Sequence, residues 1–353
     1  MSAATKLPVA YEEAESNVRA PVVTLIGSDL PSAYLDEAEP SPLMESASRL
    51  WKRITNTFKL VIVMLLVGGY PVAMMMSHKV DASPVMLSQV TAWTSPEVGV
   101  TLIMAGRELT GPGWASDRPA WHPQARLTAL PAWQEGLTSA LSDYTLLAAS
   151  LSLNSEAQAD PDLLAAGRLL APTYESDTIP RLNAAAEALQ RYDGRLARGL
   201  AAAPSGQDSI LAELGLFADW AVTAQERLRT SADDGGAWPA SRADIEAIYL
   251  ARAHAHAAAQ LINASLSAEP DLIFNRDLSE ARDTALTAWT RAAQFNPVFI
   301  SSQSGTGRFL SDHPATMAYY MSEAELATKA FQATMIAQTA SPVAVASTSN
   351  SAP

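Results

Sequence analysis

The sequence contains no cysteine, and of its 353 residues only 17% are charged and 7% are aromatic. The absence of cysteine excludes disulfides, thiolate zinc sites, iron–sulfur clusters and cysteine nucleophiles. Basic residues are scarce, with 24 Lys and Arg against 37 Asp and Glu and a net charge of -13. A nucleic-acid-binding protein typically has a basic face, so this balance argues against a nucleic-acid partner.

The charge is unevenly distributed along the chain. Residues 1–50 carry a net charge of -5, residues 51–79 a net charge of +4, and residues 80–353 a net charge of -12. Hydrophobic residues make up 48% of the chain, which is enough to bury a core. A short basic segment between two acidic regions is therefore the first organising feature of the sequence.

The basic segment surrounds an uncharged apolar run from Leu60 to Met76. Its 17 residues reach the lower limit of the range of about 17–25 for a membrane-spanning helix. Flanking basic residues favour that interpretation over a buried core helix. Three of them precede the run and only Lys79 follows closely, so the positive-inside rule places the N-terminus in the cytoplasm and residues 80–353 across the membrane. We therefore expect a single-pass protein that contacts the lipid bilayer through residues 60–76.

The rest of the chain divides by composition and pattern. Its first segment is rich in Ala, Ser, Pro and Glu, and its last is rich in Ser, Ala and Val, so neither is expected to fold. The expected organisation is a disordered acidic cytoplasmic tail (1–50), a basic collar with the transmembrane helix (51–79, core 60–76), a linker (80–94), an α-helical domain (95–338) and a disordered C-terminal tail (339–353).

The segment from residue 95 onward shows helical signals and no sustained alternation of apolar and polar residues. Ser95, Pro96 and Glu97 place an N-cap residue, a first-turn Pro and a first-turn acid in order. Ser241 and Asp244 resemble a capping box. Helices are predicted over residues 95–109, 125–153, 160–170, 178–203, 207–231, 241–267, 276–295 and 314–338. The fold class is thus predicted to be all-α: a single transmembrane helix followed by an antiparallel helical-bundle-like domain.

Two loops, 111–123 and 296–314, concentrate aromatic, Gly, Pro and ionisable residues. If they meet, their side chains could line a polar cleft that supports acid–base chemistry or binds an anionic or sugar-like ligand. The alternative remains open that Asp312 caps a helix, His313 packs in its first turn and Trp114 fills the core. The candidate ligand-binding residues are Trp114, Asp117, Trp121, His122, Arg308, Asp312 and His313.

No catalytic residue, metal site or cofactor is predicted. His254 and His256 lie two positions apart on a predicted helix, so they face different directions and cannot chelate one metal ion from it. The Gly-x-Ser-x-Gly pattern of a nucleophile elbow is absent.

The same two loops carry a resemblance to a known family. Gly113-Trp114 and the segment Leu130 to Gly136, which reads LPAWQEG, match its first motif, and Phe295-Asn296-Pro297 and the segment Ser311 to Met317, which reads SDHPATM, match its last. With one membrane helix before both, the chain resembles the bacterial single-pass membrane proteins known only as the domain of unknown function numbered 2333. The resemblance covers about residues 60–335, and Trp133 replaces the usual Phe. It implies a bacterial inner-membrane protein with a periplasmic C-terminal domain and implies no activity.

Two functions follow from these features. The first is a membrane-tethered periplasmic helical interaction protein of the cell envelope, which binds or stabilises another envelope protein. The alternative is an enzyme or ligand sensor that acts on cell-wall or lipid-derived molecules through a cleft formed by loops 111–123 and 296–314. A homo-oligomer formed through Gly68 and Gly69 is left open, because small residues let helices approach closely.

Overall fold

The computed structural model describes residues 42–77, 80–153, 158–173, 177–233, 240–268, 276–297, 300–301 and 312–339. The chain forms two compact units, Met1–Val63 and Met64–Pro353. Residues 1–41 of the predicted N-terminal tail and residues 340–353 of the predicted C-terminal tail lie outside the described residues. Residues 42–50, which were expected not to fold, form the start of a helix.

The first helix, α1 (Pro42–Ser77), contains the run that was predicted to span a membrane. Within the ranges given above, no helix is both long enough and apolar enough to cross a bilayer. The prediction of a single-pass inner-membrane protein with a transmembrane helix at residues 60–76 is therefore wrong. The uncharged apolar run within α1, Leu60 to Met76, has 17 residues, fewer than the roughly 20 apolar residues that a bilayer typically requires.

The predicted linker packs onto the helical domain instead of standing apart from it. It contains a short helix, α2 (Leu87–Val90), and both Val85 and Val90 are buried in the main core. The amide of Val85 donates to Oε1 of Gln260 at 2.7 Å. This segment is therefore part of the domain.

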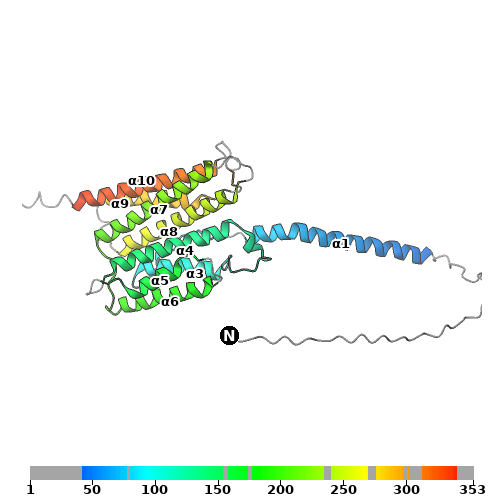
Figure 1. Cartoon of the computed structure of the whole chain (residues 1–353), viewed down its shortest axis with the longest axis horizontal. Helices are drawn as coiled ribbons and strands as arrows, with labels where there is room; N and C mark the ends of the chain where they lie inside the picture. The colour runs from blue at the N-terminus through cyan, green and yellow to red at the C-terminus, as the bar shows by residue number, and fades with distance from the viewer. Residues whose placement is uncertain are drawn as a thin grey trace, which may run out of the picture. The chain divides into compact units, whose positions relative to one another are not determined.

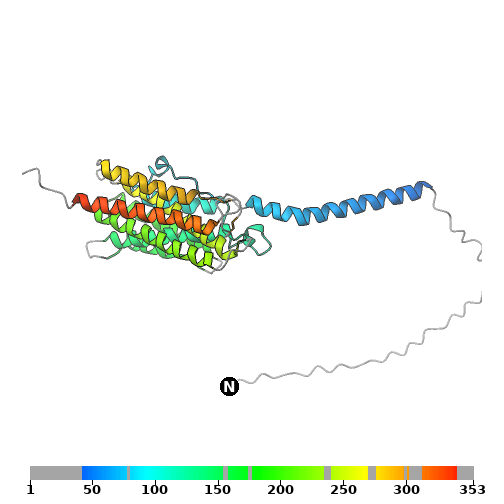
Figure 2. The same ribbon diagram turned by 90° about the horizontal axis from the view of Figure 1, so that it is seen from above.

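The helices of the domain form two groups that share one seam (Figures 1 and 2). The first group packs α3, α4, α5 and α6 together, the second packs α7, α8, α9 and α10, and α8 contacts both α3 and α4 across the seam. The described residues contain no strand, so the all-α, bundle-like prediction is confirmed for them. The bounds are α3 (Pro96–Thr110), α4 (Ala129–Leu151), α5 (Pro161–Leu170), α6 (Thr178–Leu196), α7 (Gln207–Asp233), α8 (Arg242–Ala268), α9 (Arg276–Gln294) and α10 (His313–Thr339).

The capping residues predicted from the sequence begin their helices as expected. Ser95 Oγ accepts from the amide of Val98 at 3.2 Å. Ser241 and Asp244 cap each other, because Ser241 Oγ accepts from the Asp244 amide and Asp244 Oδ2 accepts from the Ser241 amide. These contacts satisfy backbone donors that have no partner inside the helix.

Two predicted helix bounds are wrong. The helix predicted over 178–203 ends at Leu196, because Gly199 adopts a φ of 70° and the Leu200 amide turns back to the Arg195 carbonyl at 2.9 Å. The start predicted at residue 125 falls in a separate short 3₁₀ helix, η2 (Pro123–Arg126). In both places apolar residues continue at helical spacing, but a local turn ends or delays the α-helix.

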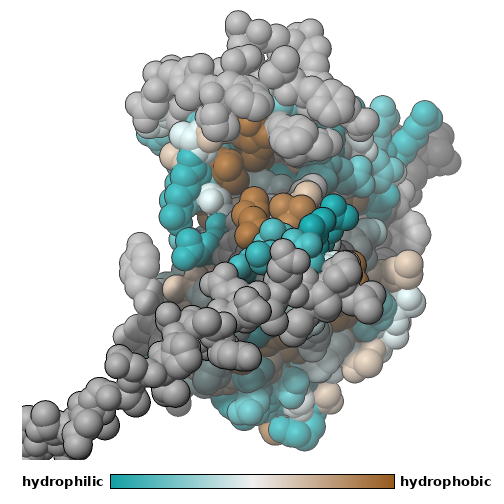
Figure 3. Space-filling view, turned by 90° about the vertical axis from the view of Figure 1, so that its right-hand side faces the viewer, coloured by the Kyte–Doolittle hydropathy of each residue, from teal (hydrophilic) through white to brown (hydrophobic). Residues whose placement is uncertain are grey.

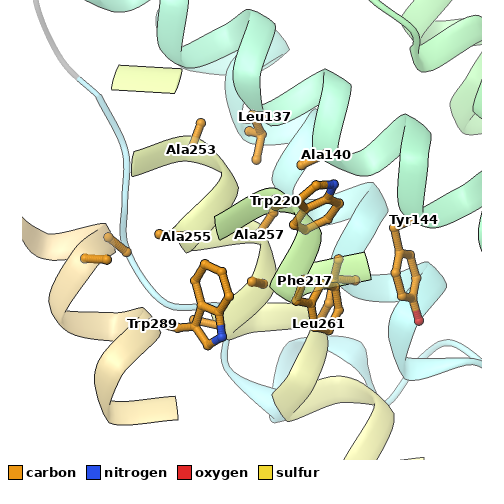
Figure 4. Close-up of a cluster of buried hydrophobic side chains, with 14 of the residues drawn as sticks. Leu137, Ala140, Tyr144, Phe217, Trp220, Ala253, Ala255, Ala257, Leu261 and Trp289 are labelled. Atoms are coloured by element: carbon orange, nitrogen blue, oxygen red, sulfur yellow. The ribbon is translucent and has the colours of Figure 1, made fainter. Parts of the chain in front are cut away.

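The core of the domain is built around α8, whose small side chains let neighbouring helices approach. Figure 4 shows Ala257 of this helix between Trp289 on one side and Phe217 and Trp220 on the other, with Ala253 near Leu137. Helix α4 approaches α8 closely: a Cβ added to Gly136 would lie 2.9 Å from the Ala253 Cβ and 3.0 Å from the Leu250 Cα. The seam therefore requires glycine at residue 136.

Among the coloured atoms of Figure 3, hydrophilic residues cover most of the face shown, and hydrophobic ones gather in small patches.

The change Gly136→Ala is expected to lower the free energy of unfolding by about 1–3 kcal/mol, because overpacking a well-filled interface costs this much. This loss should appear although alanine is the better helix former. The matched control is Gly106→Ala in α3, where an added Cβ meets nothing within 4 Å and a gain of up to about 1 kcal/mol is expected. Urea denaturation of both variants measures the effect, and equal stabilisation by both changes would contradict the close approach.

Candidate functional site

The first predicted loop is fixed in place by buried polar side chains. Gln134 of α4 accepts from the Ala115 amide at 2.9 Å and donates to both the Gly113 carbonyl and the Glu108 carboxylate at 2.9 Å. Gln124 of η2 donates to the Pro112 carbonyl at 3.0 Å. These bonds anchor the loop to α3 and α4 and turn the side chain of its first tryptophan inward.

A cavity of about 330 Å³ lies between this loop and helices α4, α5 and α6. That volume is at the lower end of the range of about 300–1,000 Å³ found for small-molecule sites. Its apolar walls come from Trp114, Pro131, Leu169, Leu170 and Leu182, and its polar groups from Ser116, Gln134, Glu135, Thr138, Thr178 and Arg181. The combination of apolar walls with a few polar groups is typical of a ligand pocket.

Arg181 is the cationic side chain of the cavity. Its Nη2 donates to the Ala171 carbonyl at 2.9 Å and to the Arg168 carbonyl at 3.4 Å, both at the end of α5. A guanidinium carries five N–H groups in a fixed plane, and these two bonds use one of its nitrogens. The backbone carbonyls therefore orient a group suited to a carboxylate or phosphate.

Arg181 was not among the candidate residues predicted from the sequence. Its position in the sequence was unusual, because a cation close to the N-terminus of a helix is disfavoured by the helix dipole. The side chain avoids that penalty by reaching the C-terminal carbonyls of α5, where the dipole favours a cation.

The predicted residues of the first loop do not all lie in the cavity. Trp114 lines it and is only 6% exposed. Asp117 lies next to it, where its Oδ2 accepts from the Ile179 amide in the first turn of α6 at 3.2 Å. Trp121 is 73% exposed, and His122 accepts from the Gln124 amide and thereby caps η2. The loop thus contributes one wall of the site and an exposed aromatic group.

The predicted residues of the second loop belong to a different part of the fold. Asp312 caps α10 by accepting from the Ala315 amide at 3.0 Å. His313 is buried, its Nδ1 accepts from the Ser301 amide at 3.0 Å, and its ring lies 6.1 Å from that of Phe295. Arg308 lies outside the described residues. The alternative interpretation, with Asp312 as cap and His313 packed in the first turn, therefore describes this end of α10.

The two loops attach to different helix groups, and no cleft formed jointly by them is found among the described residues. Loop 111–123 lies against α4 and the start of α6, whereas His313 opens α10, which packs on α7 and α9. Figure 1 shows α10 and α6 on opposite sides of the domain. The cavity next to the first loop is instead completed by α5 and α6.

Two of the segments that carry the family resemblance meet around Arg252 of α8. This buried guanidinium donates to the Ala293 carbonyl at 3.3 Å and to Asn296 Oδ1 at 3.1 Å, and it lies 5.8 Å from the centre of the Trp133 ring. Trp133 Nε1 in turn donates to Glu108 at 2.9 Å. Burial lowers the pKa of Arg252 and raises that of Glu108. The motif residues therefore join α3, α4, α8 and α9 in one buried polar network.

A second buried polar group, Glu213 of α7, was also missed. Its carboxylate accepts from Ser265 Oγ at 2.5 Å and from the Tyr144 hydroxyl at 3.3 Å. It lines a small cavity of about 20 Å³, which has room for about one water molecule. Burial, reinforced by the negative charge of Glu97, raises the pKa of Glu213 to about 7. Its position on the apolar face, between Ile210 and Phe217, was the signal in the sequence.

The two histidines of α8 are neutral, with His256 buried and His254 half-buried. Burial lowers the pKa of each to about 4, with the positive charge of Arg227 adding to the effect at His254 and that of Arg107 at His256. His254 stacks on Trp220 of α7 and His256 packs against Trp133 of α4, so they face different directions as expected. In the ranges that the structure describes, no group of three or more His, Asp or Glu side chains could hold a metal ion.

Comparisons with protein-family models, with curated proteins and with solved structures found no match to this chain. The resemblance to the family numbered 2333 therefore stays a prediction.

The change Glu213→Gln tests the raised pKa. Between about pH 4.5 and pH 7 the native state holds a proton on Glu213 that the unfolded state has released, so this group makes stability fall as pH rises through that window. Relative to wild type, the variant is expected to gain about 3 kcal/mol in free energy of unfolding from pH 4.5 to pH 8. Chemical denaturation across that range measures the difference. The exposed Glu226→Gln on the same helix is the control, and a flat difference for both variants would contradict the assignment.

Proposed function

We propose that the helical domain is a binding module whose cavity takes up a small molecule with an anionic group and several hydroxyl groups. The observation that carries the proposal is the cavity of about 330 Å³ that Trp114 and Arg181 both line. The guanidinium would bind the anionic group. The apolar walls would pack against the carbon skeleton.

The polar groups around Arg181 suit the hydroxyl groups of such a ligand. Ser116 and Thr178 supply hydroxyls, and the exposed Glu135 supplies a carboxylate acceptor. Gln134 is already committed to the loop, because its side chain makes three hydrogen bonds there. A sugar acid combines the required features: a ring with apolar faces, hydroxyl groups and one carboxylate.

A second proposal is that the domain binds another protein, and Trp121 favours it. This side chain is 73% exposed on a loop that is otherwise well anchored, and tryptophan is enriched among the residues that dominate protein interfaces. The two proposals use different faces of one loop, so a ligand in the cavity could influence the presentation of Trp121.

Glucuronate is the probe for the first proposal, and glucose is its uncharged counterpart. Titration calorimetry of the full chain is expected to detect glucuronate binding and much weaker binding of glucose. Arg181→Gln should weaken glucuronate binding by about 10- to 100-fold, the effect of losing a hydrogen bond to a charged group. Arg168→Gln is the matched control, because Arg168 is exposed near the end of α5 and its side chain does not line the cavity.

A filled cavity provides an independent check. Ala171→Leu adds bulk to a residue of the lining and should abolish binding while circular dichroism and the melting temperature show that the domain remains folded. The absence of glucuronate binding to wild type, or binding that survives both changes, would contradict the proposed ligand class.

A further inference from the structure

We propose that α1 pairs with the α1 of a second copy of this chain as a parallel coiled coil. The inference goes beyond ligand binding, because it concerns a surface outside the cavity. It rests on the spacing of the apolar residues of α1, on the exposure of their side chains to solvent and on the positions of the charged residues.

The apolar residues of α1 follow the spacing of a coiled-coil seam. Trp51, Ile54, Phe58, Val61 and Leu65 succeed one another at alternating steps of three and four, which is the pattern of positions a and d in a heptad. Their exposed fractions lie between 47% and 71%. A stripe of large apolar side chains is therefore in contact with water along this helix, and such stripes mark interaction surfaces.

The charged residues of α1 avoid this stripe. In the same register the described charges all fall at the outward positions b, c and f: Glu45, Arg49, Lys52, Arg53 and Lys59. The positions e and g that flank the seam are uncharged, as at Leu50, Thr55 and Thr57. Two copies can therefore pair without burying a charge and without placing like charges across the interface.

A second copy is the occupant that this pattern fits best. In a parallel pair, each layer of the seam brings a residue against its own copy, so Trp51 meets Trp51, Ile54 meets Ile54 and Phe58 meets Phe58. The aromatic layers alternate with β-branched ones and need no other sequence to complement them. Beyond Lys59 the outward residues Leu60, Val63 and Val67 are apolar and exposed as well, so a lipid surface is the rival occupant that the experiment has to exclude.

The chain contains no cysteine, so a single introduced cysteine reports self-association directly. In the full chain, Ile54→Cys and Val61→Cys are each expected to form an intermolecular disulfide under mild oxidation, because a parallel seam brings each residue against its own copy. Asn56→Cys, at the outward position f, is the matched control and should crosslink far less. Equal crosslinking at all three positions, or none at residues 54 and 61, would overturn the proposal.

Sedimentation equilibrium measures the association without crosslinking. The full chain is expected to be a dimer, and Ile54→Glu is expected to make it a monomer while leaving the melting temperature of the helical domain unchanged. Flotation with phosphatidylcholine vesicles addresses the rival occupant. A wild-type chain that is monomeric and floats with the vesicles would overturn the second copy in favour of a lipid surface.

Discussion

The burial of α8 is the constraint on which the rest of the domain depends. This helix contacts both helix groups, and it carries Arg252 and His256 into the interior and the half-buried His254 against α7. A charge removed from water must be compensated by close partners. Arg252 meets this requirement through the Ala293 carbonyl, Asn296 and the rings of Trp133 and Tyr249, and the histidines meet it by remaining neutral.

This constraint explains why the most distinctive sequence segments are structural. Trp133 and Asn296 are far apart in the chain, and both contact the same guanidinium. Gln134, next to Trp133, holds the loop that walls the cavity. The polar network thus couples the packing of α8 to the position of the proposed binding site, through two adjacent residues of one helix.

Helical periodicity and capping predicted most of the fold, because both are local properties. The residues of the site were harder to predict, because a cavity depends on which helices become neighbours. Trp114, a candidate residue from the sequence, lines the cavity, but its partners Leu170 and Arg181 come from helices that carried no unusual motif. His313 looked similar to His122 in the sequence, but tertiary packing places it in a separate helix group. The membrane prediction relied on an apolar run and its flanking basic residues, and no helix among the described residues is long and apolar enough to cross a bilayer.

The buried ionisable groups also make folding a proton-exchange reaction. Between about pH 4.5 and pH 6.5, folding takes up one proton at Glu213 and prevents His254 and His256 from holding the protons that they carry in the unfolded chain. In that range the two histidines release two protons on folding and Glu213 takes up one, so folding releases about one proton net from these three groups. Between about pH 6.5 and pH 7 only the uptake at Glu213 remains. Their combined contribution is greatest near pH 6.5, so the interior of the domain favours a slightly acidic to neutral medium.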